Sequence, residues 1–201
     1  EMCIRDRKKD LYIEGVQNNG IINHYEYIIN SEGTIEIRHV LKPEGKMPLW
    51  FPRIGLTLTV SDALDQVKWY GRGPQENYPD RKTGYPMGIY ASTVQAMYEP
   101  YLMPQDYGLR TDVRWLQLTT DKGIGLQFKM NEWFNFNIYP YSTDNLTKAM
   151  YTYQLQKQKG MTLNLDYATT GVGCTARGVF GAYKAMPQEY RRTISIRPMM
   201  K

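Results

Sequence analysis

Apolar and polar residues alternate with a period of two along most of this chain. Between residues 53 and 60, apolar side chains occupy the even positions, and the odd positions hold Arg53, Gly55, Thr57 and Thr59. This alternation is typical of a β-strand with one buried face. Similar segments occur at 22–29, 35–41, 66–71, 115–118, 124–128, 134–138, 163–167 and 194–196. Because turn-forming residues separate several of these segments, we predict an all-β fold, a large antiparallel β-sandwich.

Two segments interrupt the alternation. Residues 142–156 favour a helix, with Ser142 or Thr143 as the N-cap before Leu146 and Ala149. Residues 72–112 contain five prolines and little periodicity. A long irregular stretch inside a compact domain is usually functional or an interaction surface. We see no internal repeat and no linker, so we predict a single domain over residues 8–201.

The first seven residues, Glu1–Arg7, resemble the translation of a transposase mosaic-end adapter used in preparing sequencing libraries. No long apolar stretch follows their charges, so they do not form a signal peptide. We expect residues 1–7 to be an artefact that packs against nothing, and the rest to be an N-terminally truncated fragment. The alternative is a native basic start that includes Lys8 and Lys9.

Composition narrows the class of protein. Of the 201 residues, 42% are apolar and 22% charged, as in ordinary globular domains. The net charge of +5 is spread along the sequence, which gives nucleic-acid binding little support, and no apolar run is long enough for a membrane-spanning helix. The 17 tyrosines suit either a carbohydrate-binding surface or a well-packed sandwich, and composition alone favours the second.

Few residues offer metal or nucleophilic chemistry. Two cysteines, Cys3 and Cys174, provide neither a disulfide framework nor a Cys-rich zinc site, and His24 and His39 leave little material for a His-based metal site. We therefore assign no metal ligand. Within the irregular segment lie the carboxylates Glu76, Asp80, Glu99 and Asp106. We expect them to accept hydrogen bonds from loop backbone or nearby arginines, because spacing in a loop does not establish the facing pair that a glycosidase needs.

Residues 69–81 read Trp-Tyr-Gly-Arg-Gly-Pro-Gln-Glu-Asn-Tyr-Pro-Asp-Arg. This run resembles the G-P-x-E-N-Y-x-D-R signature of the C-terminal, small-chain domain of glycoside hydrolase family 2 β-galactosidases. Further blocks resemble the family in the same order, at 97–101, 104–110, 136–142, 163–166 and 171–173, with Asp106 and Tyr107 departing from its pattern. The resemblance implies a β-supersandwich like that of galactose mutarotase, here incomplete at its N-terminal side.

The resemblance also implies what the chain contributes. In the family, the two catalytic glutamates belong to a (β/α)₈ barrel upstream, so no catalytic residue is assigned here. The full protein would hydrolyse terminal non-reducing β-D-galactosides with retention, using barrel carboxylates ~5 Å apart. This chain would supply a sugar-adjacent wall and a domain interface. Candidate substrate-side or interface residues are Glu76, Asn77, Asp80, Arg81, Phe180 and Tyr183.

Two of these candidates come from a departure from the family. Some members place a Trp on the sugar from the loop after the last G-x-G, but residues 174–180 contain no Trp. Phe180 or Tyr183 would replace it, and a core role for either residue is the open alternative. Family members commonly use Mg²⁺, Na⁺ or Ca²⁺, whose ligands lie largely outside this domain. The natural galactoside, the oligomeric state and the compartment stay open.

The signature loop should be stiff. Pro74 and Pro79 each fix a backbone angle, and Asn77 can bond its own backbone in a turn. We expect Glu76 or Asp80 to form a charge-assisted pair with Arg81 or another arginine.

Two other functions remain as alternatives. An aldose 1-epimerase would need an acid/base pair, typically His with Glu, on the concave face of the sheet, and neither His24 nor His39 has such a setting. A stand-alone carbohydrate-binding module would use the tyrosines as a stacking platform. A hydrolysis assay on the chain alone separates an enzyme from a module.

Overall fold

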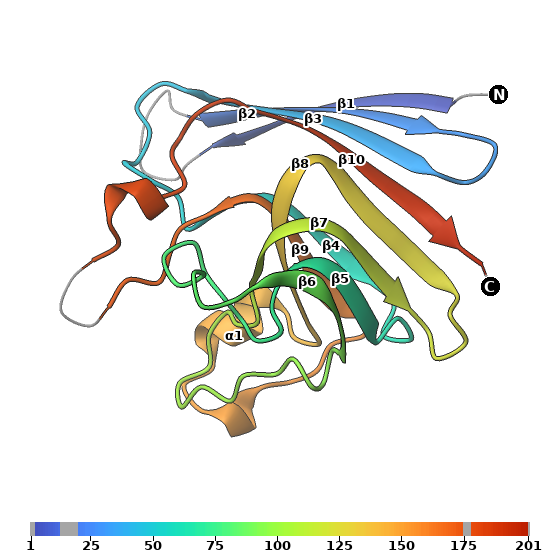
Figure 1. The fold of residues 1–201 in the computed structure, drawn as a ribbon. Helices are drawn as coiled ribbons and strands as arrows, with labels where there is room; N and C mark the ends of the chain where they lie inside the picture. Colours follow the sequence, from blue (N-terminus) through green and yellow to red (C-terminus); the bar gives the residue numbers. More distant parts are fainter. Residues whose placement is uncertain (1–2, 13–19, 175–177, 201) are drawn as a thin grey trace.

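The computed structural model describes residues 20–174 and 178–200, and the backbone of residues 3–12. The described strands are β1 (Cys3–Tyr12), β2 (Gly20–Ile29), β3 (Ile35–Glu44), β4 (Arg53–Val60), β5 (Gln66–Arg72), β6 (Met87–Thr93), β7 (Arg110–Thr119), β8 (Gly125–Tyr139), β9 (Met161–Thr169) and β10 (Tyr190–Met199). Between them lie α1 (Thr143–Lys148) and two 3₁₀ turns, η1 (Thr152–Gln154) and η2 (Gly181–Tyr183). The predicted all-β, antiparallel architecture is confirmed (Figure 1).

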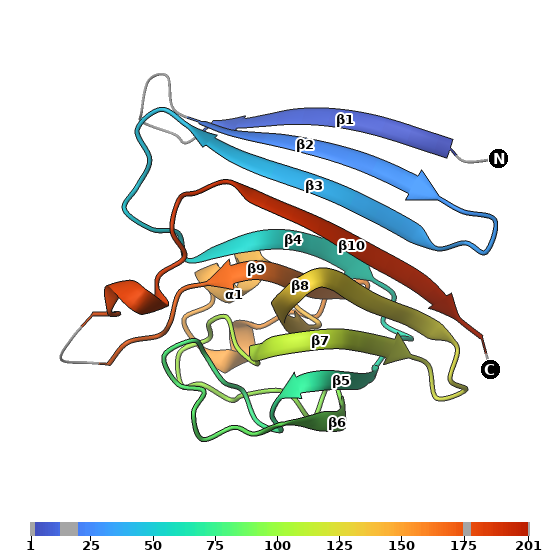
Figure 2. The ribbon, with the colours of Figure 1, turned by 45° about the horizontal axis from the view of Figure 1, so that its top comes forward.

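All strand pairs are antiparallel and belong to one ten-stranded sheet. Its main path runs β1-β2-β3-β10-β8-β7-β5-β6, and β4 and β9 branch from β8. The branch arises because β8 changes partner along its length. Residues 125–130 pair with β10, whereas Asn135–Tyr139 pair with β9. Figure 2 shows the resulting arrangement, with β1, β2, β3 and β10 on one side and the remaining strands on the other.

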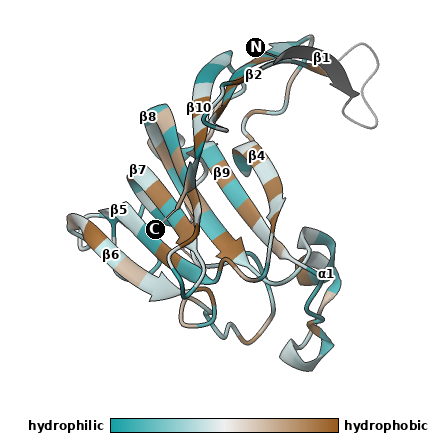
Figure 3. Cartoon of the chain, turned by 90° about the vertical axis from the view of Figure 1, so that its right-hand side faces the viewer, coloured by the Kyte–Doolittle hydropathy of each residue, from teal (hydrophilic) through white to brown (hydrophobic). Residues whose placement is uncertain are grey.

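The core follows from the alternation. Brown bands alternate with teal or pale ones along β4, β7 and β9 in Figure 3, as expected of strands whose successive side chains point to opposite faces. The largest cluster of buried apolar side chains draws on most of the sheet and includes Trp69, Phe128, Phe134 and Phe136. A second cluster, built on Tyr107, Tyr139 and Leu146, attaches α1 to the body.

One strand departs from the half-buried pattern that its sequence predicts. From Met161 to Tyr167 every residue of β9 is buried, so the strand is covered on both faces. Its two edges are also covered, because β4 pairs with one and β8 with the other. Its polar residues, Asn164 and Asp166, are therefore inside the molecule, at 1% and 2% exposure.

The two segments predicted to be irregular (72–112) and helical (142–156) differ in part from the prediction. The stretch 72–112 includes β6, an edge strand in which no residue is fully buried, although Tyr90 packs against the core. Its sequence therefore gives only a weak alternating signal. In the predicted helix, α1 ends at Lys148 and η1 follows after a break. The N-cap prediction is correct, since the Ser142 hydroxyl accepts from the Asn145 N–H at 3.0 Å.

The expectation that residues 1–7 pack against nothing is wrong for Cys3–Arg7. These residues form the start of β1 and pair with Tyr25–Ile29 of β2. Antiparallel pairing uses backbone N–H and C=O groups that every residue except proline provides, so the segment needs no side-chain pattern to join the sheet. Residues 1 and 2 lie outside the described part, and the adapter origin of the peptide stays a prediction.

None of the helices in the described part of the chain has the length and apolarity needed to cross a membrane.

Candidate functional site

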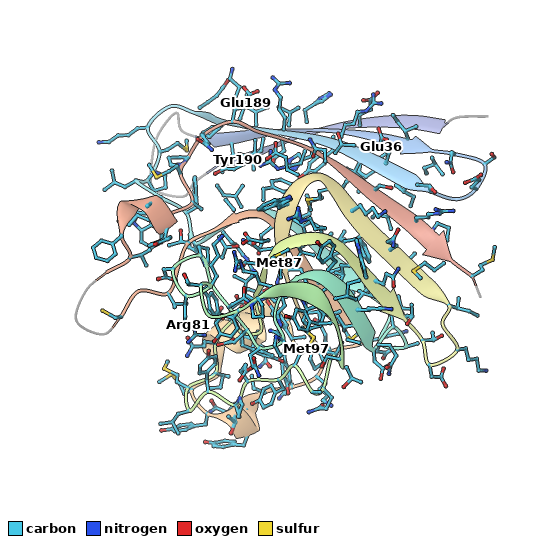
Figure 4. The ribbon with its side chains drawn as sticks, in the orientation of Figure 1. Glu36, Arg81, Met87, Met97, Glu189 and Tyr190 are labelled. Atoms are coloured by element: carbon cyan, nitrogen blue, oxygen red, sulfur yellow. The ribbon has the colours of Figure 1, made fainter. Side chains whose placement is uncertain are left out.

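The signature loop, residues 73–81, follows β5 and precedes the turn before β6. Arg81, its last residue, is labelled in Figure 4. Tyr78 and Arg81 close a tight turn with paired backbone hydrogen bonds of 3.3 and 2.8 Å. The Asn77 side chain donates to the Gln75 carbonyl at 3.0 Å, as predicted for a turn that bonds its own backbone.

Asn77 also ties the loop to the sheet. Its backbone N–H donates to the Leu109 carbonyl at 2.8 Å. Its side-chain oxygen accepts from the Thr111 N–H at 3.1 Å and from the Thr111 hydroxyl at 2.5 Å. Asn77 is fully buried, so these bonds satisfy groups that water does not reach. The loop is thereby fixed to the start of β7.

Glu76 is the central acceptor of the loop. Only 6% of the residue is exposed. Its carboxylate accepts from the Gly108 N–H at 2.9 Å, the Tyr78 hydroxyl at 3.2 Å, the Arg81 guanidinium at 2.9 Å and the Tyr101 hydroxyl. The predicted Glu76–Arg81 pair is therefore present.

These bonds decide the protonation state of Glu76. Burial by itself would raise the pKa of its carboxyl, but the hydrogen bonds from Tyr101, Gly108 and Arg81 outweigh burial and hold the pKa below its ordinary value. Glu76 is thus an ionised group whose oxygens are already engaged. It is suited to positioning the loop, and unsuited to donating a proton.

Asp80 accepts hydrogen bonds from loop backbone, one of the two kinds of partner expected for it. Its carboxylate accepts from the backbone N–H groups of Val172 and Gly173 at 3.1 and 2.7 Å. Gly171 lies so close that a Cβ on it would sit 2.3 Å from the Asp80 carboxyl carbon. The segment 171–173, which we call the 171–173 turn, is thereby joined to the signature loop, and Asp80 is not paired with Arg81.

A cavity of about 540 Å³ opens beside these two loops. Its lining includes Pro52, Arg53, Tyr78, Arg81, Tyr101, Gln105, Asp106, Thr143, Thr169, Thr170 and Val172. Loops contribute most of this wall, and β4 and β9 contribute Arg53 and Thr169 from their ends. We call it the signature-loop cavity.

Arg53 organises the floor of the signature-loop cavity. Its guanidinium contacts Asp166 at 2.6 Å, Asn137 at 3.2 Å and Asp106 at 3.3 Å. Burial raises the pKa of the Asp166 carboxyl to about 6, although the Arg53 charge acts in the opposite direction. Asn137 also donates to Asp106 at 2.9 Å. Both carboxylates are thus engaged with the same arginine.

Sequence reasoning did not select Arg53 or Asp166 as site residues. The available signal was the polar face of three segments, where Arg53, Asn137 and Asp166 occupy alternating positions between apolar residues. In a half-buried strand this face meets solvent. Here β4, β8 and β9 are neighbours, so these side chains meet on one face of the sheet, and the loop that carries Asp106 and Tyr107 contacts them through Asn137.

The structure brings four of the six candidates together. Glu76, Asn77, Asp80 and Arg81 form the loop described above. Phe180 is 65% exposed and does not line the signature-loop cavity, and it is not a core residue. Tyr183 is 39% exposed and lines a second, smaller cavity. The role that the resemblance gave to these two aromatics is not tested by this geometry.

His39 has no epimerase-like setting. His39 is 1% exposed, and its ring nitrogens bond the Tyr167 hydroxyl at 2.7 Å and the Asn23 side-chain oxygen at 3.0 Å, with Tyr25 stacked on the ring at 4.1 Å. No carboxylate is among these partners. His24 is exposed on β2. The described residues contain no group of three or more His, Cys, Asp or Glu side chains that could hold a metal ion.

A family described as the beta-galactosidase small chain matches residues 6–196, nearly the whole described structure. The chain belongs to the β-galactosidase small-chain family. The signature loop and its anchoring network are therefore the structure of a small-chain motif.

Curated relatives agree with this membership. A beta-galactosidase of Priestia megaterium is 36% identical over 162 residues, which are 80% of this chain and 16% of the relative. One from Vibrio cholerae is 39% identical over 122 residues, 61% of this chain and 11% of the relative. One from Pseudoalteromonas haloplanktis is 33% identical and covers 77% of this chain and 14% of the relative. The small-chain domain thus spans less than a fifth of the length of these relatives.

Proposed function

We propose that the complete protein is a retaining β-galactosidase that hydrolyses terminal non-reducing β-D-galactose. In this proposal the small-chain domain provides a wall beside the sugar and a surface for the catalytic domain. The observation that carries the proposal is the family match over residues 6–196. The relatives are named as beta-galactosidases, and we extend galactoside hydrolysis from them to this chain through the family match.

The assignment of catalysis to another domain is supported by how the carboxylates of this chain are used. A retaining glycosidase needs one carboxylate free to attack and a second one protonated, about 5 Å apart. The Glu76 oxygens already accept four hydrogen bonds, and Asp80 is bonded to the 171–173 turn. Asp106 and Asp166 share Arg53.

Glu99 is the carboxyl that most needs a direct test. Burial and then the nearby Glu76 charge raise its pKa, while the same loop network lowers the pKa of Glu76. Carboxyl pairs with pKa values displaced in opposite directions occur in acid–base sites. Against a catalytic role for this pair stands the saturation of Glu76 by donors, which leaves it no free lone pair aimed at a substrate.

The signature-loop cavity is the surface that we assign to the sugar-side wall. Arg81, Tyr101, Gln105 and Thr143 bring a guanidinium, hydroxyls and an amide to its lining. Such groups can bond either sugar hydroxyls or the backbone of an inserted loop from the catalytic domain. The anchoring of Glu76 and Asn77 keeps these groups in place before any partner arrives.

The experiment is a hydrolysis assay with a chromogenic β-galactoside on two proteins. The full-length protein that contains this chain should be active, and NMR should show the β anomer of galactose as the first product. The chain alone should show no turnover. An inactive full-length protein, or turnover by the chain alone that Glu76→Gln or Glu99→Gln abolishes, would contradict the proposal.

A further inference from the structure

The outer edge of β6 is open in the described structure. β6 is the last strand on the main path of the sheet and pairs with β5 only. Figures 2 and 3 both show β6 as the outermost strand on its side of the molecule. In an antiparallel strand with a neighbour on one edge, about half of the backbone N–H and C=O groups point to the other edge. No described strand pairs with that edge of β6, so these groups are available to a partner.

β6 lacks the features that usually protect an exposed edge. Natural edge strands are blunted by charged side chains, proline, bulges or very short length. β6 has seven residues, and neither a charged residue nor a proline is among them. Its pairing with β5 runs from Met87 to Thr93 without a register shift. The pairing of β4, which also has one described neighbour, shifts between Ile54 and Gly55. β6 is thus a regular template for another strand.

The sheet beside this edge is strongly basic. The neighbouring strands β6, β5, β7, β8 and β10 together contain eight basic and two acidic residues, a net charge of +6, compared with +5 for the whole chain. Both acidic residues are already paired, Asp112 with Arg72 and Lys82, and Glu132 with Arg192. The charge that is spread along the sequence is therefore gathered in this half of the sheet. A field of this kind attracts anionic partners.

Lys68 brings this charge to the edge of the sheet. It lies on β5 directly opposite Ala91 of β6, and both residues are exposed. Residues directly opposite each other share a face of the sheet, and the Ala91 side chain is a single methyl group. A longer side chain on an added strand would therefore cross Ala91 and reach the Lys68 ammonium. Lys68 forms no ion pair with any described residue, so its charge is available to such a partner.

We propose that β6 accepts an extended, acidic peptide segment of a partner protein as a further strand of the sheet. The backbone of the segment would bond the free edge of β6, and a carboxylate opposite Ala91 would reach Lys68. An apolar side chain two positions away would cover Ile89, which is 61% exposed and lies on the same face as Ala91. In this mode of recognition, main-chain hydrogen bonds provide affinity and alternate side chains provide specificity.

Other partners fit this edge less well. A second copy of β6 has no carboxylate to offer Lys68, and it would bring the same basic sheet towards the first. A nucleic-acid strand would neutralise the charge, but its sugar-phosphate backbone has no N–H groups to donate to the free carbonyls of β6. The inference does not rest on the proposed hydrolysis, because it concerns a sheet edge and a peptide partner.

The test uses the full-length protein that contains this chain and a fluorescent peptide of about three Thr-Glu-Thr-Val repeats. In an extended peptide of this sequence, Glu and Val alternate along one face. We expect saturable binding in fluorescence anisotropy, weaker at high salt. Hydrogen exchange followed by mass spectrometry should show slower exchange of the β6 amides in the complex. This protection would not follow from a contact between charges alone.

Two control peptides separate the backbone from the charge. In the first, Pro replaces Thr, which keeps the carboxylates but removes half of the N–H groups and the strand conformation. In the second, Gln replaces Glu, which keeps the backbone but removes the charge. We expect no binding of the first peptide and weaker binding of the second.

Three variants locate the contact. Lys68→Gln should weaken binding about two- to fivefold, as expected for an exposed ion pair. Ala91→Glu places a carboxylate on the edge itself, beside Lys68, and should weaken binding further. Lys129→Gln is the matched control, because Lys129 is an exposed cation on β8, about 19 Å or four strand spacings from the added strand, and should leave affinity unchanged. Circular dichroism checks that each variant folds.

Several results would overturn the inference. They are an absence of binding by the full-length protein, equal affinity for either control peptide, and protection from exchange outside β6 only. Displacement of the peptide by an oligothymidylate would also overturn it, because the surface would then select negative charge and not a strand. Each readout is a binding measurement, so failure here leaves the proposed hydrolysis to its own assay.

Discussion

At the scale of single residues, the buried carboxylates of this chain act as acceptors that hold loops together. Glu76 illustrates the point, because four donors from three segments converge on it. The pairing of Glu76 with Arg81 was predictable, since five residues separate them within one stiff loop. The pairing of Arg53 with Asp166 was not, because they are 113 residues apart and meet only through strand order.

The donors around Glu76 contribute unequally to stability. Glu76→Ala leaves the Tyr78 and Tyr101 hydroxyls and the Gly108 N–H short of their acceptor, so we expect a loss of about 2–3 kcal/mol in the free energy of unfolding. Arg81 is 49% exposed at its side chain, so Arg81→Ala should cost less than about 1 kcal/mol. Urea unfolding of both variants checks this order, and a larger loss for Arg81→Ala would contradict it.

His39 makes stability depend on pH. Burial lowers its pKa to about 4 from an ordinary value of 6.5, so the unfolded chain binds more protons between these values. Stability attributable to His39 is full above about pH 6.5 and falls as the pH decreases towards 4. Between pH 7 and pH 5 the loss should be about 2 kcal/mol.

The control for this prediction is His39→Gln, which removes the titrating group. Differences between the two proteins isolate His39 from Asp166, whose raised pKa acts in the opposite direction over part of the same range. Urea unfolding at several pH values should show the wild type losing more stability than His39→Gln on acidification. Parallel curves would contradict the assignment.

At the scale of elements, the sequence predicted the strands that have one face on the hydrophobic core, because their apolar and polar residues alternate. It missed β6, in which no residue is fully buried, and the pairing of β1, which uses backbone groups that leave no signal in the sequence. It extended the helix past Lys148, although the N-cap at Ser142 was readable. The candidate site was predictable as a loop, whereas the cavity beside it depends on how β4, β8 and β9 meet.

Adding one methyl group at Gly171 should disturb the contact between the signature loop and the 171–173 turn. A Cβ at Gly171 would collide with the Asp80 carboxyl, and moving either loop weakens the two hydrogen bonds to Asp80. We therefore expect Gly171→Ala to lower the melting temperature by several degrees. Gly84→Ala is the matched control, because a Cβ there meets nothing within 4 Å. Equal melting temperatures for the two variants would refute this account.

At the scale of the whole molecule, β10 joins two parts of the sheet. It pairs with β3 on one edge and β8 on the other, so within the described sheet the strand pairing of β1, β2 and β3 with the remaining strands runs through β10. Local opening should therefore release β1–β3 before the strands that surround β8.

Hydrogen exchange followed by mass spectrometry tests this order. Amides of β2 and β3 should exchange faster than those of β7 and β9. Ile194→Ala in β10 should accelerate exchange in β2 and β3 selectively, whereas Leu118→Ala in β7 should not, although both side chains are fully buried. Slower exchange in β2 and β3 than in β7 and β9 would show that the sheet opens elsewhere.

The central position of β10 also bears on synthesis at the ribosome. β10 follows the other nine strands in the sequence, yet it occupies the middle of the sheet. Until it emerges, β3 and β8 each present an unpaired edge, and exposed edges of nascent chains are sites of aggregation. A ribosome stalled before Tyr190 would hold a chain with two open edges more than the complete sheet, which makes this the stage of translation at which a chaperone has most to protect.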